Sequence, residues 1–167
     1  MATQLTPHFT LEGLCESSTA TRLGIDNTPP DNLIGNAYRL AEGLEQVQSV
    51  LGSPIHHSSG YRCEALERVL SSKDFAHWCE LHAKSDADWP EYFERKQHPE
   101  FEAEDFTCPQ FGTPLEVVKL IAGSTIQFDQ CIQEGTWVHI SFTETPRREV
   151  LTAHFAGGKV TYTNGLA

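Results

Sequence analysis

Three side chains in the second half of the chain could together hold a metal ion. His98 lies seven residues before Asp105, and His139 follows later in the context Trp137-Val138-His139. Two imidazoles and one carboxylate suit catalytic zinc, because they leave a fourth coordination position for water. With 8 histidines and 23 acidic residues in the chain, roughly one such pair arises by chance at any spacing, so structural histidines are the alternative.

The residues around these candidates predict the elements that must position them. Residues 101–106 alternate as a β-strand would, which turns Ala103 and Asp105 to the same face. His98 would then come from the loop before this strand. His139 lies in a second predicted strand, residues 136–142, so the two strands must lie close together for a metal site to form.

The remaining pattern predicts helices first and strands last. Apolar residues recur at steps of three and four from Asp31 to the stop at Gly52, which indicates a long amphipathic helix. Shorter helices are expected after Thr10 and at 63–70, 73–84, 88–96 and 113–121, and further strands at 54–62, 127–133, 149–155 and 159–163. This order predicts an α+β fold with N-terminal helices packed on a C-terminal antiparallel sheet.

Composition limits the functions to consider. The length of 167 residues with 39% hydrophobic content predicts a single domain over residues 1–167. The net charge of -11 argues against nucleic acid as a partner, because such binding needs a basic surface. No apolar stretch is long enough for a membrane span, and no signal peptide is visible, so we expect synthesis in the cytoplasm. Five irregularly spaced cysteines indicate a reducing compartment rather than a disulfide framework.

Three motifs in order resemble the zinc D-alanyl-D-alanine carboxypeptidase family, which shares the hedgehog/DD-peptidase zinc-binding fold. Residues 58–62, Ser-Ser-Gly-Tyr-Arg, resemble its SGYR signature. Residues 98–106 resemble its HxxGxAxDF segment, and residues 137–141, Trp-Val-His-Ile-Ser, resemble its WVHxS segment. The flanking segments 21–27, 128–130 and 147–151 resemble phage-type members. The resemblance covers nearly the whole chain except a helical insertion at about 71–97.

The resemblance implies a role for each matched residue. His98, Asp105 and His139 would bind one zinc ion. Arg62 would bind substrate or stabilise charge at the scissile carbonyl, with Ser59 and Tyr61 of the same motif as further substrate-binding residues. Glu134, five residues before His139, is the candidate general base or acid. Without the family, a surface salt bridge for Arg62 and a solvated loop carboxylate for Glu134 are the simpler interpretations.

The implied activity is zinc-dependent hydrolysis of peptidoglycan stem peptides, by a D-Ala-D-Ala carboxypeptidase or an endolysin-type endopeptidase. Such a protein would act at the cell wall after release from the cytoplasm, or would be associated with a virion. A non-catalytic module that binds cell wall or a virion partner on the same fold is the alternative.

Two departures from the family pattern keep this alternative open. Phe101 replaces a glycine, and Lys96 replaces a small residue two positions before the first histidine. The bulky Phe101 would either crowd the metal loop or fill a pocket. Within the insertion, His77 and His82 are five residues apart, which does not place both on one helical face, so they are expected to be structural. The insertion itself would be a lid, a wall of the substrate site or a partner-binding surface.

Overall fold

The first helices begin and end at residues whose side chains favour those positions. The computed structural model describes residues 2–166. As predicted, α1 (Leu11–Leu14) follows Thr10, whose hydroxyl accepts the Gly13 N–H. The sequence analysis missed α2 (Ser18–Leu23), which ends at Gly24 in a left-handed conformation.

The predicted long helix exists but begins later than expected. Asp31 does not cap it; residues Asp31–Leu33 form the 3₁₀ turn η1, and α3 (Ile34–Leu51) follows. Gly52, with a φ of 61°, ends the helix as predicted. Gly43 lies where a Cβ would be 2.5 Å from the Phe142 ring, so only glycine allows this close approach to the helix.

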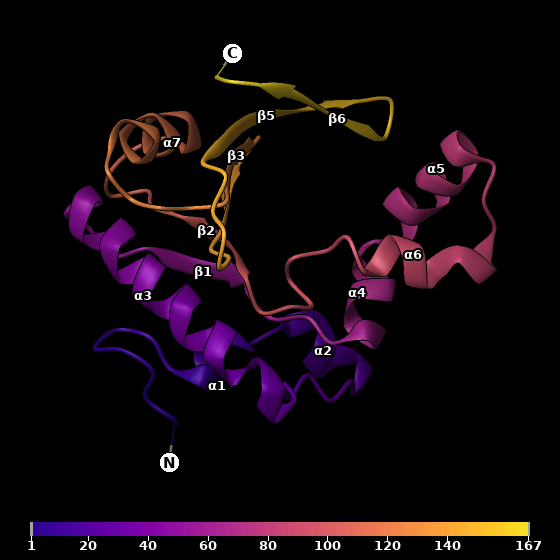
Figure 1. Ribbon diagram of the computed structural model, residues 1–167, viewed down its shortest axis with the longest axis horizontal. Helices are drawn as coiled ribbons and strands as arrows, with labels where there is room; N and C mark the ends of the chain where they lie inside the picture. Colours follow the sequence, from indigo (N-terminus) through magenta and orange to yellow (C-terminus); the bar gives the residue numbers. More distant parts are fainter. Residues whose placement is uncertain (1, 167) are drawn as a thin grey trace.

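A six-stranded sheet crosses the middle of the molecule in the order β1-β2-β4-β3-β5-β6 (Figure 1). Its strands are β1 (His56–Ser59), β2 (Ala103–Thr107), β3 (Gln130–Glu134), β4 (Trp137–Ser141), β5 (Glu149–Ala156) and β6 (Lys159–Asn164). The Gly157-Gly158 pair, with φ of 58° and 76°, closes the predicted β5–β6 hairpin. The α+β class is thus confirmed.

The expectation of an antiparallel sheet is wrong at one pair of strands. The strand β3 pairs with β5 in parallel, whereas its pairing with β4 is antiparallel. The connection at residues 142–148 starts β5 at the end of the sheet where β4 finishes, so β5 runs opposite to β4. Because β3 lies between them and also runs opposite to β4, β3 and β5 point the same way.

Helices α3 and α7 (Pro114–Gly123) cover one face of the sheet, where the main core lies (Figure 1). Helix α7 begins with a capping box between Thr113 and Glu116. The sheet contributes alternate residues to this core, among them Phe106, Cys131, Val138 and Ile140. Their neighbours in each strand, Asp105, Ile132 and His139, therefore face the opposite side.

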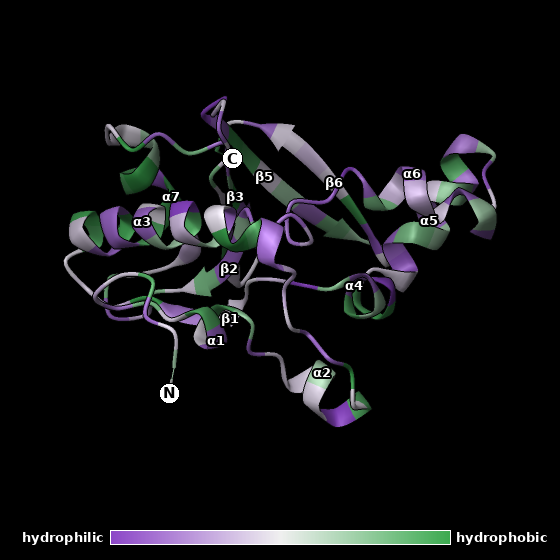
Figure 2. Cartoon of the chain, turned by 60° about the horizontal axis from the view of Figure 1, so that its bottom comes forward, coloured by the Kyte–Doolittle hydropathy of each residue, from purple (hydrophilic) through white to green (hydrophobic). Residues whose placement is uncertain are grey.

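Helix α4 (Glu64–Leu70) and the insertion at about 71–97 together form a separate arm beyond that opposite side. Helices α4, α5 (Ser72–His82) and α6 (Trp89–Phe93), with the 3₁₀ turn η2 (Asp86–Asp88), lie away from α3 and α7 in both views (Figures 1 and 2). An aromatic cluster of Phe75, Trp78, Trp89 and Tyr92 forms a small core of its own. None of the helices within residues 2–166 has the length and apolarity needed to cross a membrane.

Candidate metal centre

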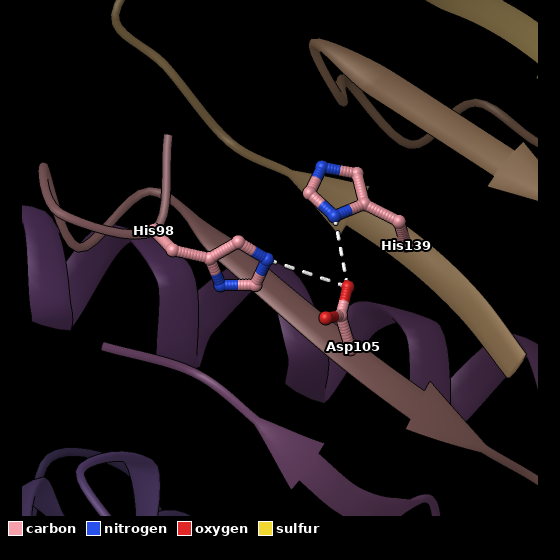
Figure 3. A group of neighbouring side chains, drawn as sticks. All are labelled: His98, Asp105 and His139. Atoms are coloured by element: carbon pink, nitrogen blue, oxygen red, sulfur yellow. Dashed lines mark hydrogen bonds and ion pairs between the residues drawn. The ribbon is translucent and has the colours of Figure 1, made fainter. Parts of the chain in front are cut away.

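The predicted ligands His98, Asp105 and His139 meet on the face of the sheet that the arm overlooks. Asp105 on β2 lies directly opposite His139 on β4 in the strand register. His98 lies in the turn between α6 and β2, and its ring approaches from the side (Figure 3). All three residues are at most 8% exposed, so the group is enclosed by protein.

The geometry fits a single metal ion. The Asp105 Oδ1 atom is 2.9 Å from His139 Nδ1 and 3.4 Å from His98 Nε2 (Figure 3). One ligand atom from each residue lies within 4.8 Å of the other two. Two ligand atoms on a tetrahedral zinc ion are roughly 3.3 Å apart, from metal–ligand bonds of about 2.0 Å. The residues can therefore bind zinc with small side-chain adjustments.

The second nitrogen of His98 explains the glycine of the SGYR motif. His98 Nδ1 lies 2.7 Å from the Gly60 carbonyl oxygen and donates to it, which leaves Nε2 unprotonated and free to bind metal. A Cβ at Gly60 would lie 2.4 Å from the Leu14 carbonyl oxygen and 2.7 Å from Glu104 Oε2. Only glycine therefore brings this carbonyl group to the histidine.

Arg62 holds the metal-ligand candidate Asp105 in place by a hydrogen-bonded ion pair. Its Nη2 donates to Asp105 Oδ2 at 2.6 Å and its Nε to Ser59 Oγ at 2.9 Å. Its Nη1 donates to Glu67 Oε2 at 3.3 Å, and Glu67, which is 1% exposed, also accepts from the Ser71 hydroxyl. Arg62 thus orients the Asp105 carboxylate, so that Oδ1 faces the two histidines.

A row of hydrogen-bonded side chains, Gln97, Asp129 and Arg147, leads away from His139, and the sequence analysis did not assign it to the site. His139 Nε2 lies 3.5 Å from Gln97 Oε1, and Gln97 Nε2 donates to Asp129 Oδ2 at 2.7 Å. The Arg147 side chain donates two hydrogen bonds to Asp129, of 2.8 Å and 2.6 Å, and its backbone N–H donates a third at 3.2 Å. The family-like segments 128–130 and 147–151 contain Asp129 and Arg147 and could have indicated them. Nothing in the sequence singled out Gln97.

The hydrogen bonds that link His139 to Gln97 and Asp129 indicate which nitrogen of the His139 ring donates to Gln97. An ionised carboxylate only accepts hydrogen bonds, so Asp129 attracts the amide nitrogen of Gln97. The amide oxygen then points to His139 Nε2, which donates to it. Without a metal ion, His139 Nδ1 donates to Asp105 Oδ1 at 2.9 Å, and it would give up this proton to bind a metal ion on the side where Asp105 lies.

Burial and charge shift the pKa values of these groups in opposite directions. Burial, together with the Arg62 charge, lowers the pKa of His98. Burial also opposes protonation of His139, but its hydrogen bond to Asp105 and the charge of that carboxylate outweigh burial and raise its pKa. Burial would raise the pKa of Asp105, but the charges and hydrogen bonds of both histidines hold it well below the usual range.

The metal ligands open into a cavity of about 470 Å³ that Glu134 also lines. Glu134 accepts hydrogen bonds from Trp137 Nε1 at 2.9 Å and from the Tyr162 hydroxyl at 3.2 Å. Burial raises the pKa of Glu134, with a further contribution from the Asp105 charge. A buried carboxyl group with a raised pKa, beside a metal-binding cluster, has the properties of a general base.

The structure places the other predicted residues differently. The Tyr61 ring is 6% exposed and stacks on Phe101 in the main core, 5.0 Å between centroids, so it does not face the cavity. Ser59 acts on Arg62 rather than lining the cavity. Arg62, Glu134 and the three metal-ligand candidates all line it.

Phe101 does not crowd the metal loop. It has a φ of 57°, which explains why family members have glycine there, and its side chain is completely buried. Its burial and its stacking on Tyr61 offset the cost of the left-handed backbone. His77 and His82 are remote from the metal ligands: His77 lies 3.7 Å from Glu80, and the His82 ring packs on Trp78. The only metal-binding group found within residues 2–166 is that of His98, Asp105 and His139.

Comparison with known proteins gives a family match for the N-terminal part of the chain. The family model for peptidase M15 matches residues 7–81, which include the SGYR motif and end before His98. No curated protein and no solved structure matches the chain. The metal cluster thus lies outside the matched segment and adds evidence of its own. The match supports the resemblance drawn from the sequence, because residues 7–81 are similar to the peptidase M15 family.

Proposed function

We propose that this protein is a zinc-dependent peptidase that hydrolyses a peptide bond with a metal-activated water molecule. The observation that carries the proposal is the convergence of His98, Asp105 and His139 at the base of a cavity, in a chain that matches the peptidase M15 family. Zinc in such a site lowers the pKa of bound water to about 7, which makes hydroxide available at neutral pH.

Separate residues around the cavity would bind the metal ion, transfer the proton and position the general base. His98 Nε2, His139 Nδ1 and Asp105 Oδ1 would hold the ion. Glu134 accepts the proton of the attacking water on a carboxylate oxygen and returns it to the leaving amine. Trp137 and Tyr162 hold that carboxyl group in place by their hydrogen bonds.

Arg62 is the candidate for stabilising charge on the scissile carbonyl oxygen. Two of its donors are committed at 2.6 Å and 2.9 Å, to Asp105 and Ser59. Its contact with Glu67 is longer, 3.3 Å, so Nη1 is the donor that can turn toward a substrate oxygen. Loss of such a donor typically costs about 3 kcal/mol of transition-state stabilisation.

The substrate and setting rest on the resemblance. We propose peptidoglycan stem peptides as the substrate, a hedgehog/DD-peptidase type of arrangement, and one domain over residues 1–167 with the insertion at 71–97. Action at the cell wall after release, or association with a virion, belongs to the same proposal. The binding-module alternative loses the argument from Phe101, because that residue fills the core instead of the metal site.

Zinc content and hydrolysis test the proposal together. Purified protein should contain about one zinc per chain by elemental analysis, and should release D-alanine from a muropeptide ending in D-Ala-D-Ala or cleave within its stem. The Glu134→Gln variant should keep the zinc and lose hydrolysis. Protein that takes up no zinc even when it is supplied would refute the enzyme. Zinc uptake without hydrolysis of any stem peptide would favour the non-catalytic alternative.

A further inference from the structure

A second buried carboxyl group lies directly before Asp105 in strand β2. Glu104 is completely buried, and the alternation of the strand turns it to the face opposite Asp105, toward the main core. It takes no part in the proposed reaction. A carboxylate is costly to remove from water unless a charged partner compensates for the loss. A buried carboxylate at this position therefore needs a partner from the neighbouring elements.

The partner is His57 on β1, the edge strand next to β2 in the sheet (Figure 1). His57 Nδ1 lies 2.6 Å from Glu104 Oε1. On the other side of the ring, His57 Nε2 lies 3.2 Å from the backbone carbonyl oxygen of Glu16. Both ring nitrogens face oxygen atoms, and the ring can donate to both only as an imidazolium ion. Burial opposes this charge, but the hydrogen bond and the charge of Glu104 outweigh burial and raise the pKa of His57.

The Glu104 carboxylate also packs directly against the backbone of Gly60. A Cβ atom at Gly60 would lie only 2.7 Å from Glu104 Oε2, so a side chain there would push the carboxylate away. The regular pairing of β1 with β2 is interrupted between His57 and Ser59, and Ser59 is the last residue of β1. The ion pair therefore fixes a segment that the strand pairing holds only in part.

Gly60 connects this ion pair to the metal-ligand candidates. Its carbonyl oxygen accepts from His98 Nδ1 at 2.7 Å, and this hydrogen bond orients the ring so that Nε2 is left for the metal. A displaced Gly60 backbone would lengthen or misalign that bond, and the His98 ring would follow. Glu104 is also the neighbour of Asp105 in β2, so the ion pair is linked to two of the three candidates.

An ion pair is not the simplest way to fill this space. Apolar side chains of similar volume usually stabilise a protein as well as a buried ion pair does, and often better. A charged pair adds a fixed geometry, because leaving either charge unpaired in the interior is costly. His57 and Glu104 are thus better suited to holding Gly60 in place than to adding stability.

We propose that His57 and Glu104 are positioning residues of the metal centre. Their ion pair fixes Gly60, the Gly60 carbonyl group orients His98, and the affinity for zinc depends on this arrangement although neither residue of the pair lines the cavity. The inference rests on the proposed zinc site. It adds two residues at positions that the family motifs leave unspecified.

Replacing the ion pair by two apolar residues tests this role. We expect His57→Leu/Glu104→Met to keep a melting temperature near that of the wild type but to bind zinc roughly tenfold more weakly in chelator competition. His8→Leu/Glu45→Met is the matched control, because His8 Nδ1 and Glu45 Oε2 form a similar pair at 2.7 Å outside the cavity. Wild-type zinc affinity in a stably folded His57→Leu/Glu104→Met protein would overturn the proposal.

Glu104→Gln is a milder variant for the case in which the apolar pair does not fold. The amide keeps the shape of the side chain and an acceptor for His57 but loses the charge. Its zinc affinity should lie between those of the wild type and the double variant. An affinity equal to that of the wild type would also count against the proposal.

The His98 ring gives a readout that does not require zinc. In the metal-free wild type, nitrogen NMR should show the ring proton on Nδ1, held by the Gly60 carbonyl group, and the double variant should populate the other tautomer as well. A wild type that binds no zinc would refute the peptidase, while a changed His98 tautomer in the variant would still support the positioning role. Zinc-dependent hydrolysis with unchanged His98 signals in the variant would keep the peptidase and refute the positioning role.

Discussion

The metal centre and the arm of α4, α5 and α6 are built in different ways. Asp105 and His139 lie on adjacent strands of the sheet, and hydrogen bonds to Arg62 and Gln97 orient them. The arm is held by its own small aromatic cluster, and Arg68 packs over Trp89 at 4.8 Å. Two of the three metal-ligand candidates therefore depend on the sheet, where positions are well determined, whereas the arm has few ties to the main core.

This difference teaches how such a site can vary. The metal ligands tolerate little displacement, because zinc requires specific distances and angles. The arm, which contributes none of these ligands, can change in length and sequence provided that it leaves the strands undisturbed. The insertion at 71–97 lies in this second region; the motif resemblance leaves it out, although the family match extends to residue 81.

The largest expected effect comes from the sheet. His139→Ala should remove bound zinc and reduce hydrolysis to background, because only one imidazole and one carboxylate remain. His154→Ala is a matched control on β5, where the ring is exposed and bonds to Thr163. Elemental analysis and peptide assays check both variants, and an active His139→Ala protein would show that the catalytic centre lies elsewhere.

Glu134→Gln should lower kcat by about 10²- to 10⁴-fold while zinc stays bound. The amide keeps the shape and the hydrogen bond with Trp137 but cannot accept the proton. The variant therefore distinguishes metal binding by His98, Asp105 and His139 from proton transfer by Glu134. If zinc were lost as well, Glu134 would belong to the metal centre rather than to its surroundings.

The pH profile gives a related prediction. Burial raises the pKa of Glu134 above its ordinary value of 4.5, and the base is active only when deprotonated. Activity should therefore fall as the pH is lowered, with the acidic limb displaced to a pH above 4.5. The limb should disappear from the residual activity of Glu134→Gln. An acidic limb that persists in the variant would assign it to another group, such as a protonating metal ligand.

Gln97→Leu should weaken zinc binding by roughly 10- to 100-fold, because the hydrogen bond that orients His139 is lost. Chelator competition measures the affinity, and the wild-type circular dichroism spectrum is the control for folding. Gln97→Glu keeps an acceptor for His139 and should lose less. Zinc affinity equal to wild type in Gln97→Leu would mean that the sheet alone positions the imidazole.

The smallest effect on the metal should come from the arm. Phe75→Ala removes a ring that packs on Trp89 and Tyr92, and should destabilise the arm by up to about 3–5 kcal/mol. Hydrogen exchange should increase in α5 and α6 while zinc affinity stays unchanged. Phe106→Ala, on β2 with its side chain in the main core, is the contrasting variant and should lower the stability of the whole molecule. Zinc loss in Phe75→Ala would break the distinction between the two regions.

Local features were predictable because they depend on nearby residues. The Thr10 cap, the stop at Gly52 and the Gly157-Gly158 hairpin each follow from backbone preferences of a few residues. Alternation in 101–106 correctly turned Asp105 away from the core. The short helix α2 was missed, since its pattern spans too few residues for periodicity to show.

The types and order of the metal-ligand candidates were determined by the sequence itself, because imidazole and carboxylate groups are what zinc binds. The tertiary structure alone decided that β5 runs parallel to β3, that Phe101 fills the core, and that Gln97 joins His139 to Asp129. It also decided that Arg62 donates to Asp105 and Ser59 and that Glu134 lines the same cavity as the metal-ligand candidates. These features join residues far apart in the chain, and only packing of the whole sheet and arm brings such residues together.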